Sequence, residues 1–174
     1  MRKKNQSTQF IKTCLSLSLL TLMKDQSIND ITVSQICEKA GFGRTTYYRH
    51  FSNNKEEMVL YISSLKWEQY KQEHEEDVKK DEGKELMKHI YNHRDFFLLL
   101  DQQNLTGLMY KIFDTIFGRK ENEDPILSYG KSIFVGMYFG VVYEWIKQGC
   151  IDTPEEVQKK IEQGFAYAIA NLKK

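Results

Sequence analysis

The sequence predicts an all-α protein with a small N-terminal three-helix domain and a larger helical C-terminal domain. Apolar residues recur at spacings of three and four, and no segment shows the alternation of a half-buried strand. Only two prolines, Pro125 and Pro154, interrupt the chain, so long stretches are free to be helical. Hydrophobic residues make up 41% of the 174 residues, which is enough to bury a core.

Charge is divided unevenly between the two predicted domains. Residues 1–55, the head, hold nine Lys/Arg and three Asp/Glu, a net charge of +6. Residues 56–174, the body, hold 16 Lys/Arg and 21 Asp/Glu, a net charge of −5. A basic head on an acidic body favours a head that binds a polyanion. Chance clustering of charge is the alternative.

Three helices are expected in the head. The first covers about 7–24, where apolar residues repeat on one face. A short helix then begins at Thr32, whose hydroxyl can cap it together with Gln35 three residues later. Gly41 ends this helix, because it has no Cβ to resist a left-handed turn. A second short helix is expected at about 43–50.

Two short helices joined by a tight glycine turn predict a helix-turn-helix, whose second helix commonly enters the DNA major groove. Phe42 and Tyr47 are expected to face inward. Arg44 can pair with a guanine through two hydrogen bonds, and threonines can donate, accept or touch a thymine methyl. The predicted base-reading residues are Arg44, Thr45, Thr46 and Tyr48, and the predicted phosphate contacts include Thr32 and His50.

In the body, a long helix should begin after Asn53 or Asn54, either of which can cap it. Residues 70–82 are interpreted as its exposed end and a connection. Further helices are expected at about 83–93, 94–102, 104–118 and 126–148, and a last one begins at Thr153 with Glu156 as its capping partner.

The predicted 126–148 helix is apolar on nearly every side, so other helices must cover it. We expect it to pack on the last helix and on a partner subunit. Glycines four residues apart let helices approach closely. The predicted dimer residues are Gly136, Phe139, Gly140, Tyr143, Phe165, Ala168 and Leu172.

A ligand pocket in the body would need an apolar lining with a few polar groups. The alternative is that these residues fill the core. The candidates are Phe97, Tyr110, Phe113, Phe117, Phe134, Met137 and Tyr138.

The sequence contains no set of residues that indicates catalysis or a cofactor. No nucleophile–base pair, phosphate-binding glycine loop or zinc spacing occurs, so we expect no enzyme activity. His89 and His93 could share a helix face, with Glu85 as a third metal ligand. The favoured interpretation is that they are solvated or capping histidines, with no metal.

The expected location is the cytoplasm, without membrane insertion. The three cysteines have no paired spacing, and the basic N-terminus continues into an amphipathic helix rather than a signal peptide. The most apolar window, residues 133–146, is shorter than a bilayer span and contains Glu144.

The stretch ITVSQICEKAGFGRTTYYRHFSNNKEEMVLYI resembles the DNA-binding segment of the TetR/AcrR family of bacterial transcriptional regulators. The segments HRDFFLLLDQQNLTGLMYKIF and VVYEWIKQGCIDTPEEV resemble the C-terminal domain of Firmicute-type members. The resemblance implies a homodimer on a palindromic operator, controlled by an effector that binds the body. It also implies that the last two helices form a four-helix bundle with those of the partner.

By this resemblance, base recognition is expected at Arg44, Thr45, Thr46 and Tyr48, and phosphate contacts at Thr32, His50 and Lys55. The loop before Lys55 is one residue longer than is usual in the family, so Asn54 is an alternative to Lys55. The expected function is a repressor released by a small-molecule effector. The alternatives are a transcriptional activator or coactivator, or an interaction adaptor that kept the fold.

Overall fold

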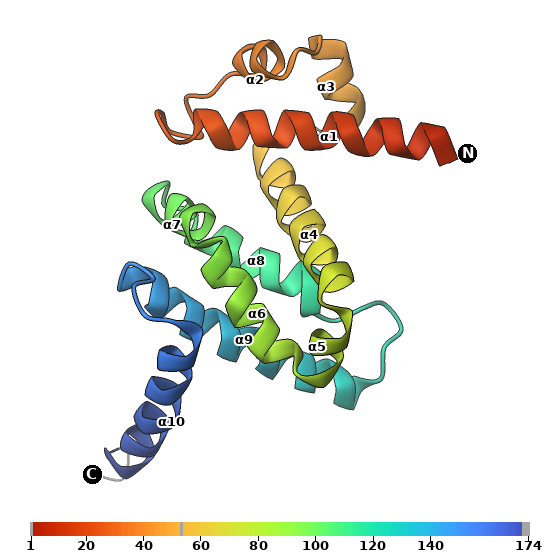
Figure 1. The fold of residues 1–174 in the computed structure, drawn as a ribbon. Coiled ribbons are helices and arrows are strands. Elements are labelled where there is room, and N and C mark those ends of the chain that lie inside the picture. Colours follow the sequence, from red (N-terminus) through yellow and green to blue (C-terminus); the bar gives the residue numbers. More distant parts are fainter. Residues whose placement is uncertain (1, 53, 172–174) are drawn as a thin grey trace.

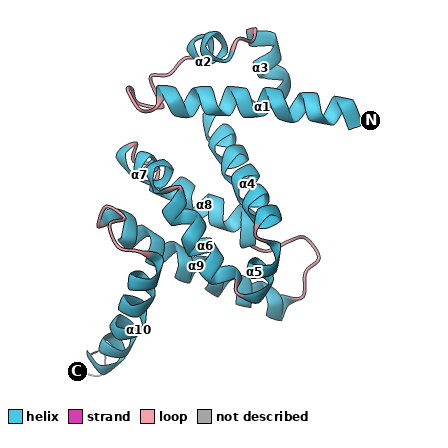
Figure 2. Ribbon diagram, viewed as in Figure 1, coloured by secondary structure: helices cyan, strands magenta, loops and turns pink. Residues whose placement is uncertain are grey.

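A computed structural model of the chain describes residues 2–52 and 54–171, and the side chains of 2–6, 165, 168 and 169 are not described. Within these residues the regular structure consists of ten helices and no strand (Figures 1 and 2). The prediction of an all-α fold is confirmed.

The head consists of α1 (Arg2–Leu22), α2 (Val33–Ala40) and α3 (Arg44–His50). In Figure 1, α2 and α3 lie together along one side of α1. The three helices share a core to which the start of α4 contributes. Its fully buried side chains are Leu15, Leu19, Met23, Ile36, Tyr47, Met58 and Val59.

Helix α4 (Lys55–Glu73) connects the head to the body (Figure 1). Its first half packs on α1, and it also packs on α8 (Thr106–Phe117). Trp67, near the C-terminal end of α4, is buried in the core of the body. The buried side chains of α4 therefore join the core of the head and that of the body into one continuous hydrophobic core.

The body begins with a short helix that the sequence interpretation missed, α5 (Glu75–Lys80). It has no buried residue, which agrees with the prediction that this stretch is exposed. The next helices are α6 (Glu82–Asn92), α7 (Arg94–Gln102) and α8, each within a few residues of its predicted range. Their buried aromatic and aliphatic side chains form the core of the body.

The last two helices are α9 (Pro125–Lys147) and α10 (Pro154–Asn171). Asp124 caps α9 by accepting from the N–H groups of Ile126 (2.8 Å) and Leu127 (3.2 Å). The predicted cap of α10 is confirmed, because the Thr153 hydroxyl accepts from Glu156 N at 3.3 Å.

Helix α9 meets α10 less closely than expected, because the side chains of the two helices line the same two cavities but the helices do not run side by side. Helix α10 leaves α9 at an angle, and the helix that it packs against is α6 (Figure 1). Helix α9 is also not covered on all sides, because only Val135, Val142, Trp145 and Ile146 are buried in it.

Helix α9 is also longer than the apolar window that the sequence suggested. With 23 residues, it is the one helix in the described ranges long and apolar enough, by length and composition alone, to cross a membrane. The expectation that this segment is too short is therefore wrong. One helix of this kind, judged by length and composition alone, is weak evidence for a membrane span.

Candidate nucleic-acid interface

Helix α2 begins with the predicted capping box. The Thr32 hydroxyl accepts from Gln35 N at 3.2 Å, and Thr32 N–H donates to Gln35 Oε1 at 2.7 Å. The same hydroxyl lies 2.8 Å from Gln35 Oε1 and donates to it. Thr32 is exposed, but its hydroxyl is engaged in the cap. The groups that α2 leaves for an anion are therefore the backbone N–H groups of its first turn.

Gly41 forms the turn between α2 and α3. Its φ of 73° and ψ of 28° are left-handed, a conformation that side chains with a Cβ rarely adopt. Phe42 N–H then donates to Cys37 O at 2.9 Å, which closes the end of α2. This geometry turns the chain sharply, so α3 starts directly after α2.

Helix α3 has two distinct faces. Tyr47 is fully buried, and Phe51, one turn later, is almost fully buried. The opposite face carries the exposed side chains, and Thr46 and His50 lie half-buried on its flank. The exposed residues are Arg44, Thr45, Tyr48 and Arg49. Helix α3 thus packs through its aromatic side and presents a cationic, hydroxyl-rich side to solvent.

The two adjacent tyrosines of α3 are in contact although they point to different faces. Their ring centroids are 5.3 Å apart, and the rings are nearly perpendicular at 89°. Edge-to-face packing of this kind is favourable. The buried Tyr47 ring therefore supports the exposed Tyr48 ring and restricts its orientation on the surface.

The structure places Lys55 differently from the expectation of a phosphate contact. Its ammonium donates to the carbonyl oxygens of Ile28, Ile31 (3.0 Å) and Asn29 (3.3 Å), in the segment that joins α1 to α2. A lysine ammonium has three donors, and these carbonyls can occupy all of them. Lys55 therefore ties α4 to the head.

Asn54 caps α4, since its side chain accepts from Glu56 N at 2.9 Å. Asn53, the other predicted cap, lies outside the described residues.

Gln103, the C-cap residue of α7, makes a second connection to the same segment, which no sequence pattern predicted. Its Oε1 accepts from Ile28 N at 2.9 Å, and its Nε2 donates to Met23 O at 2.7 Å and Gln26 O at 3.1 Å. We call these three bonds the Gln103 clamp. The clamp joins the body directly to the segment that positions α2 and α3.

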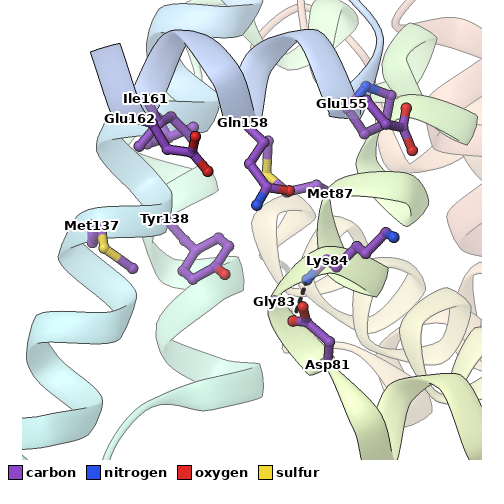
Figure 3. A pocket seen from close by; sticks show the side chains of 12 residues that line it. Asp81, Gly83, Lys84, Met87, Met137, Tyr138, Glu155, Gln158, Ile161 and Glu162 are labelled. Carbon is purple, nitrogen blue, oxygen red and sulfur yellow. Dashed lines mark hydrogen bonds between the residues drawn. The ribbon is translucent and has the colours of Figure 1, made fainter. Parts of the chain in front are cut away.

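The predicted ligand residues do not converge on one cavity. Met137 and Tyr138 line a cavity of about 240 Å³ between α6, α9 and α10, which we call the α6–α10 cavity (Figure 3). Phe97 and Phe113 line a smaller cavity of about 20 Å³ beside Trp67. The others line neither cavity, and they are Tyr110, Phe117 and Phe134.

His89 lies in the wall of the smaller cavity, so the interpretation of it as a solvated histidine is wrong. Its ring packs edge-on against Trp67 at 5.2 Å, and burial lowers its pKa to about 3, with smaller contributions from His93 and Lys66. Glu85, the proposed third metal ligand, instead accepts from the Tyr70 hydroxyl at 2.7 Å and pairs with Lys88 at 2.6 Å. In the described ranges no cluster of three or more metal-ligating side chains occurs.

The predicted dimer residues fall into three groups. Gly136 and Gly140 are exposed, and a Cβ at either would meet no atom within 4 Å. Phe139 and Tyr143 are half-buried and stacked on each other. The Phe165 and Ala168 side chains and all of Leu172 lie outside the described residues.

Sequence reasoning missed an exposed apolar stripe along α9, on the same face as Gly136. Its members repeat at spacings of three and four, which was the available signal. The stripe consists of Ile126, Tyr129, Ile133 and Met137.

Comparison with known proteins agrees with this geometry in the head. Residues 19–62 match the family model TetR_N, described as bacterial regulatory proteins of the tetR family. This range contains α2, α3, the turn between them and the start of α4. No curated protein matches the chain. Over this range the head is therefore similar to the DNA-binding segment of the TetR family of bacterial regulatory proteins, which supports a DNA-binding role for its helix-turn-helix.

Proposed function

We propose that the chain is a homodimeric transcriptional regulator that binds a palindromic operator and acts as a repressor released by an effector. The observation that carries this proposal is the exposed face of α3, with Arg44, Thr45 and Tyr48 opposite the buried Tyr47. The net charge of +6 in residues 1–55 supports it, because phosphate contacts supply much of the affinity for DNA. A regulator of this kind works in the cytoplasm.

In this proposal the four base-reading residues are Arg44, Thr45, Thr46 and Tyr48. The phosphate contacts come from the start of α2 at Thr32 and from His50 on the flank of α3. Lys55 supports binding indirectly, because its ammonium holds the segment before α2. The head is the DNA-binding part, residues 1–55, and the body, residues 56–174, carries dimerisation and effector binding.

The apolar stripe on α9 supports dimerisation. Ile126 is 83% exposed and Ile133 is 71% exposed. A contiguous apolar face of this kind commonly marks an interface. Gly136 and Gly140 lie beside the stripe and leave room for a partner backbone. A two-fold dimer would present two copies of α3 to successive major grooves, which is the arrangement that a palindromic operator requires.

An effector would act by favouring a dimer whose two α3 helices are wrongly spaced for DNA. Two connections between the parts support this mechanism. Helix α4 belongs to both cores, and the Gln103 clamp joins α7 to the segment before α2. A shift of α7 or α4 in the body would therefore change the position of α3.

The test is selection of genomic DNA fragments by the purified full-length protein, followed by sequencing of the bound fragments. We expect one enriched palindromic site. Arg44→Ala should weaken binding to that site by about 1–3 kcal/mol and relax the preference at one base position. Arg119→Ala, an equal charge change in an exposed loop of the body, is the matched control and should leave binding unchanged. Absence of an enriched site, or equal loss on random DNA, would overturn the proposal.

A further inference from the structure

The α6–α10 cavity has an apolar floor and an acidic rim. Met87 contributes from α6, Met137, Tyr138 and Val141 from α9, and Ile161 from α10. Its volume of about 240 Å³ lies just below the range typical of small-molecule sites. The cavity therefore suits a small organic molecule better than a peptide.

The Tyr138 side chain reaches across this cavity to Gly83 of α6. A Cβ at Gly83 would lie 1.8 Å from the Tyr138 hydroxyl oxygen, so only glycine at this position allows the ring to reach α6. Phe134 packs on the other side of the ring, with 4.4 Å between the ring centroids. The Tyr138 ring thus lies between α9 and α6 among the side chains that line the cavity (Figure 3).

The charged groups of the rim are predominantly acidic. Three carboxylates line the cavity, from Asp81, Glu155 and Glu162, against the single cation of Lys84. Figure 3 shows the Lys84 side chain extending away from Tyr138, whereas Gln158 and Glu162 extend from α10 towards the cavity. Glu162 makes no ion pair within the described residues. A cation in the cavity would therefore meet negative potential.

The raised pKa of Tyr138 is consistent with a negative electrostatic potential in the cavity. Burial raises the pKa of its hydroxyl, and the nearby carboxylates of Asp81 and Glu82 raise it further. Negative charge around a phenol disfavours the phenolate, and it stabilises a bound cation for the same electrostatic reason.

We infer that the α6–α10 cavity binds a small aromatic or aliphatic organic cation, held over the Tyr138 ring and neutralised by Glu162 and its acidic neighbours. Cations bind over tyrosine rings because the ring face is electronegative, and the attraction grows when water is excluded. The methionine side chains supply a soft surface that adapts to the shape of the ligand. A role of this cavity as the effector site rests on the function proposed above. Binding of a cation in the cavity does not depend on that function.

Benzyltrimethylammonium is the probe, titrated into the full-length protein by isothermal calorimetry. Benzyl alcohol and phenylacetate, of similar size but neutral and anionic, are the comparison ligands. We expect measurable binding of the cation only. Glu162→Gln should weaken it about threefold or more and Tyr138→Leu about tenfold or more. Glu121→Gln, which removes an exposed carboxylate outside the cavity, should change nothing.

Three results would overturn the inference. One is the absence of binding of the cation at millimolar concentration, as expected if a second copy of the chain filled the cavity. Another is equal affinity for the neutral or anionic ligand. The third is an unchanged affinity of Glu162→Gln for the cation. This substitution is on the surface and leaves the fold intact, so the test stays valid even if Tyr138→Leu unfolds the body.

A separate titration of the selected operator with and without the cation tests its role as effector. Weaker operator binding in its presence would support that role, and unchanged operator binding would overturn it while leaving the binding site established. Failure to bind any operator would overturn the proposed function, and the calorimetry would still decide the inference.

Discussion

The head and the body bury their apolar side chains to different extents. In the head, the side chains that face inward from α2 and α3 are buried, and the exposed face of α3 is polar apart from Tyr48. In the body, α9 exposes a row of large apolar side chains along its length. The large apolar side chains that the head exposes are Phe10 and Leu17 of α1 and Tyr48 of α3, whereas α9 of the body exposes four in a continuous row.

The difference agrees with the division of functions that we propose. A DNA-reading helix needs a rigid support and a free polar face, and α3 has both. A dimerising body needs an apolar surface that is exposed in a single chain, and α9 provides one. The two parts meet through shared α4 and through Lys55 and Gln103, so a change in one can reach the other.

The largest expected effect separates the two tyrosines of α3. Tyr47→Ala should destabilise the head by about 3–5 kcal/mol, because a fully buried aromatic side chain leaves a cavity. Tyr48, 55% exposed, is the matched control: Tyr48→Ala should cost only about 0.5–1.5 kcal/mol, from its edge-to-face contact with Tyr47, while weakening DNA binding. Denaturant unfolding followed by circular dichroism, and operator titration, measure the two effects.

The reverse pattern would contradict this assignment of faces. If Tyr48→Ala unfolded the protein, or if it left operator affinity unchanged, then Tyr48 would not belong to the proposed DNA-binding face. A stable Tyr47→Ala variant would indicate that the head core tolerates the loss by repacking.

The opposite faces of these tyrosines could be predicted from the sequence because they depend on local rules. Capping at Thr32, the glycine turn at Gly41 and helical periodicity all act within a few residues. Such patterns also located most helices of the body. Tyr47 was expected to face inward together with Phe42, and Tyr47 is fully buried.

The contacts between the two parts could not be predicted in this way. Gln103 binds residues about 80 positions away, and Lys55 binds carbonyls more than 20 positions away. Every residue has a backbone carbonyl, so the sequence does not indicate which carbonyls Gln103 and Lys55 bind. The packing of α9 could not be predicted either. Because its sequence is apolar on nearly every side, the pattern does not indicate which neighbouring helix covers which face.

The second expected effect tests the Gln103 clamp. Gln103→Ala should destabilise the head by about 2–3 kcal/mol, because it removes three hydrogen bonds of about 0.5–1.5 kcal/mol each. Gln103→Glu should cost at least as much, since a carboxylate can accept from Ile28 but repels the two carbonyls. Hydrogen exchange measures the effect, with loss of protection expected in α2 and α3 and not in α8.

The neighbouring exposed Gln102 supplies the control for the clamp. Gln102→Ala should leave the protection of the head as in the parent protein, because its side chain makes no hydrogen bond within the described residues. Equal loss of protection in head and body for Gln103→Ala would mean that the clamp does not couple the parts and only contributes to overall stability.

The smallest of the three effects is an acid sensitivity of the body. Burial lowers the pKa of His89 to about 3 from its ordinary 6.5, so the fold holds the neutral imidazole while the unfolded chain takes up a proton below pH 6.5. Stability should therefore fall as pH drops from 6.5 towards 3. Between pH 6.5 and 5 the loss is about 2 kcal/mol, at 1.36 kcal/mol per pH unit.

Two other titratable groups near His89, His93 and Glu85, affect the stability of the body in different pH ranges. The pKa of the neighbouring His93 is also lowered, by burial and then by Lys66, so it adds to the loss in the same window. The pKa of Glu85 lies below its ordinary 4.5, where the hydrogen bonds from Lys88 and Tyr70 outweigh its burial, so its contribution is lost only at lower pH.

Tryptophan fluorescence can follow this unfolding in the body alone, since both tryptophans, Trp67 and Trp145, belong to it. Trp67 is the better reporter, because its ring packs directly against His89. His89→Gln should flatten the dependence of the unfolding free energy on pH between 6.5 and 5, with His93 supplying the remaining slope. Parallel curves for parent and variant would mean that His89 takes up its proton in the folded body, and that the cavity wall admits water.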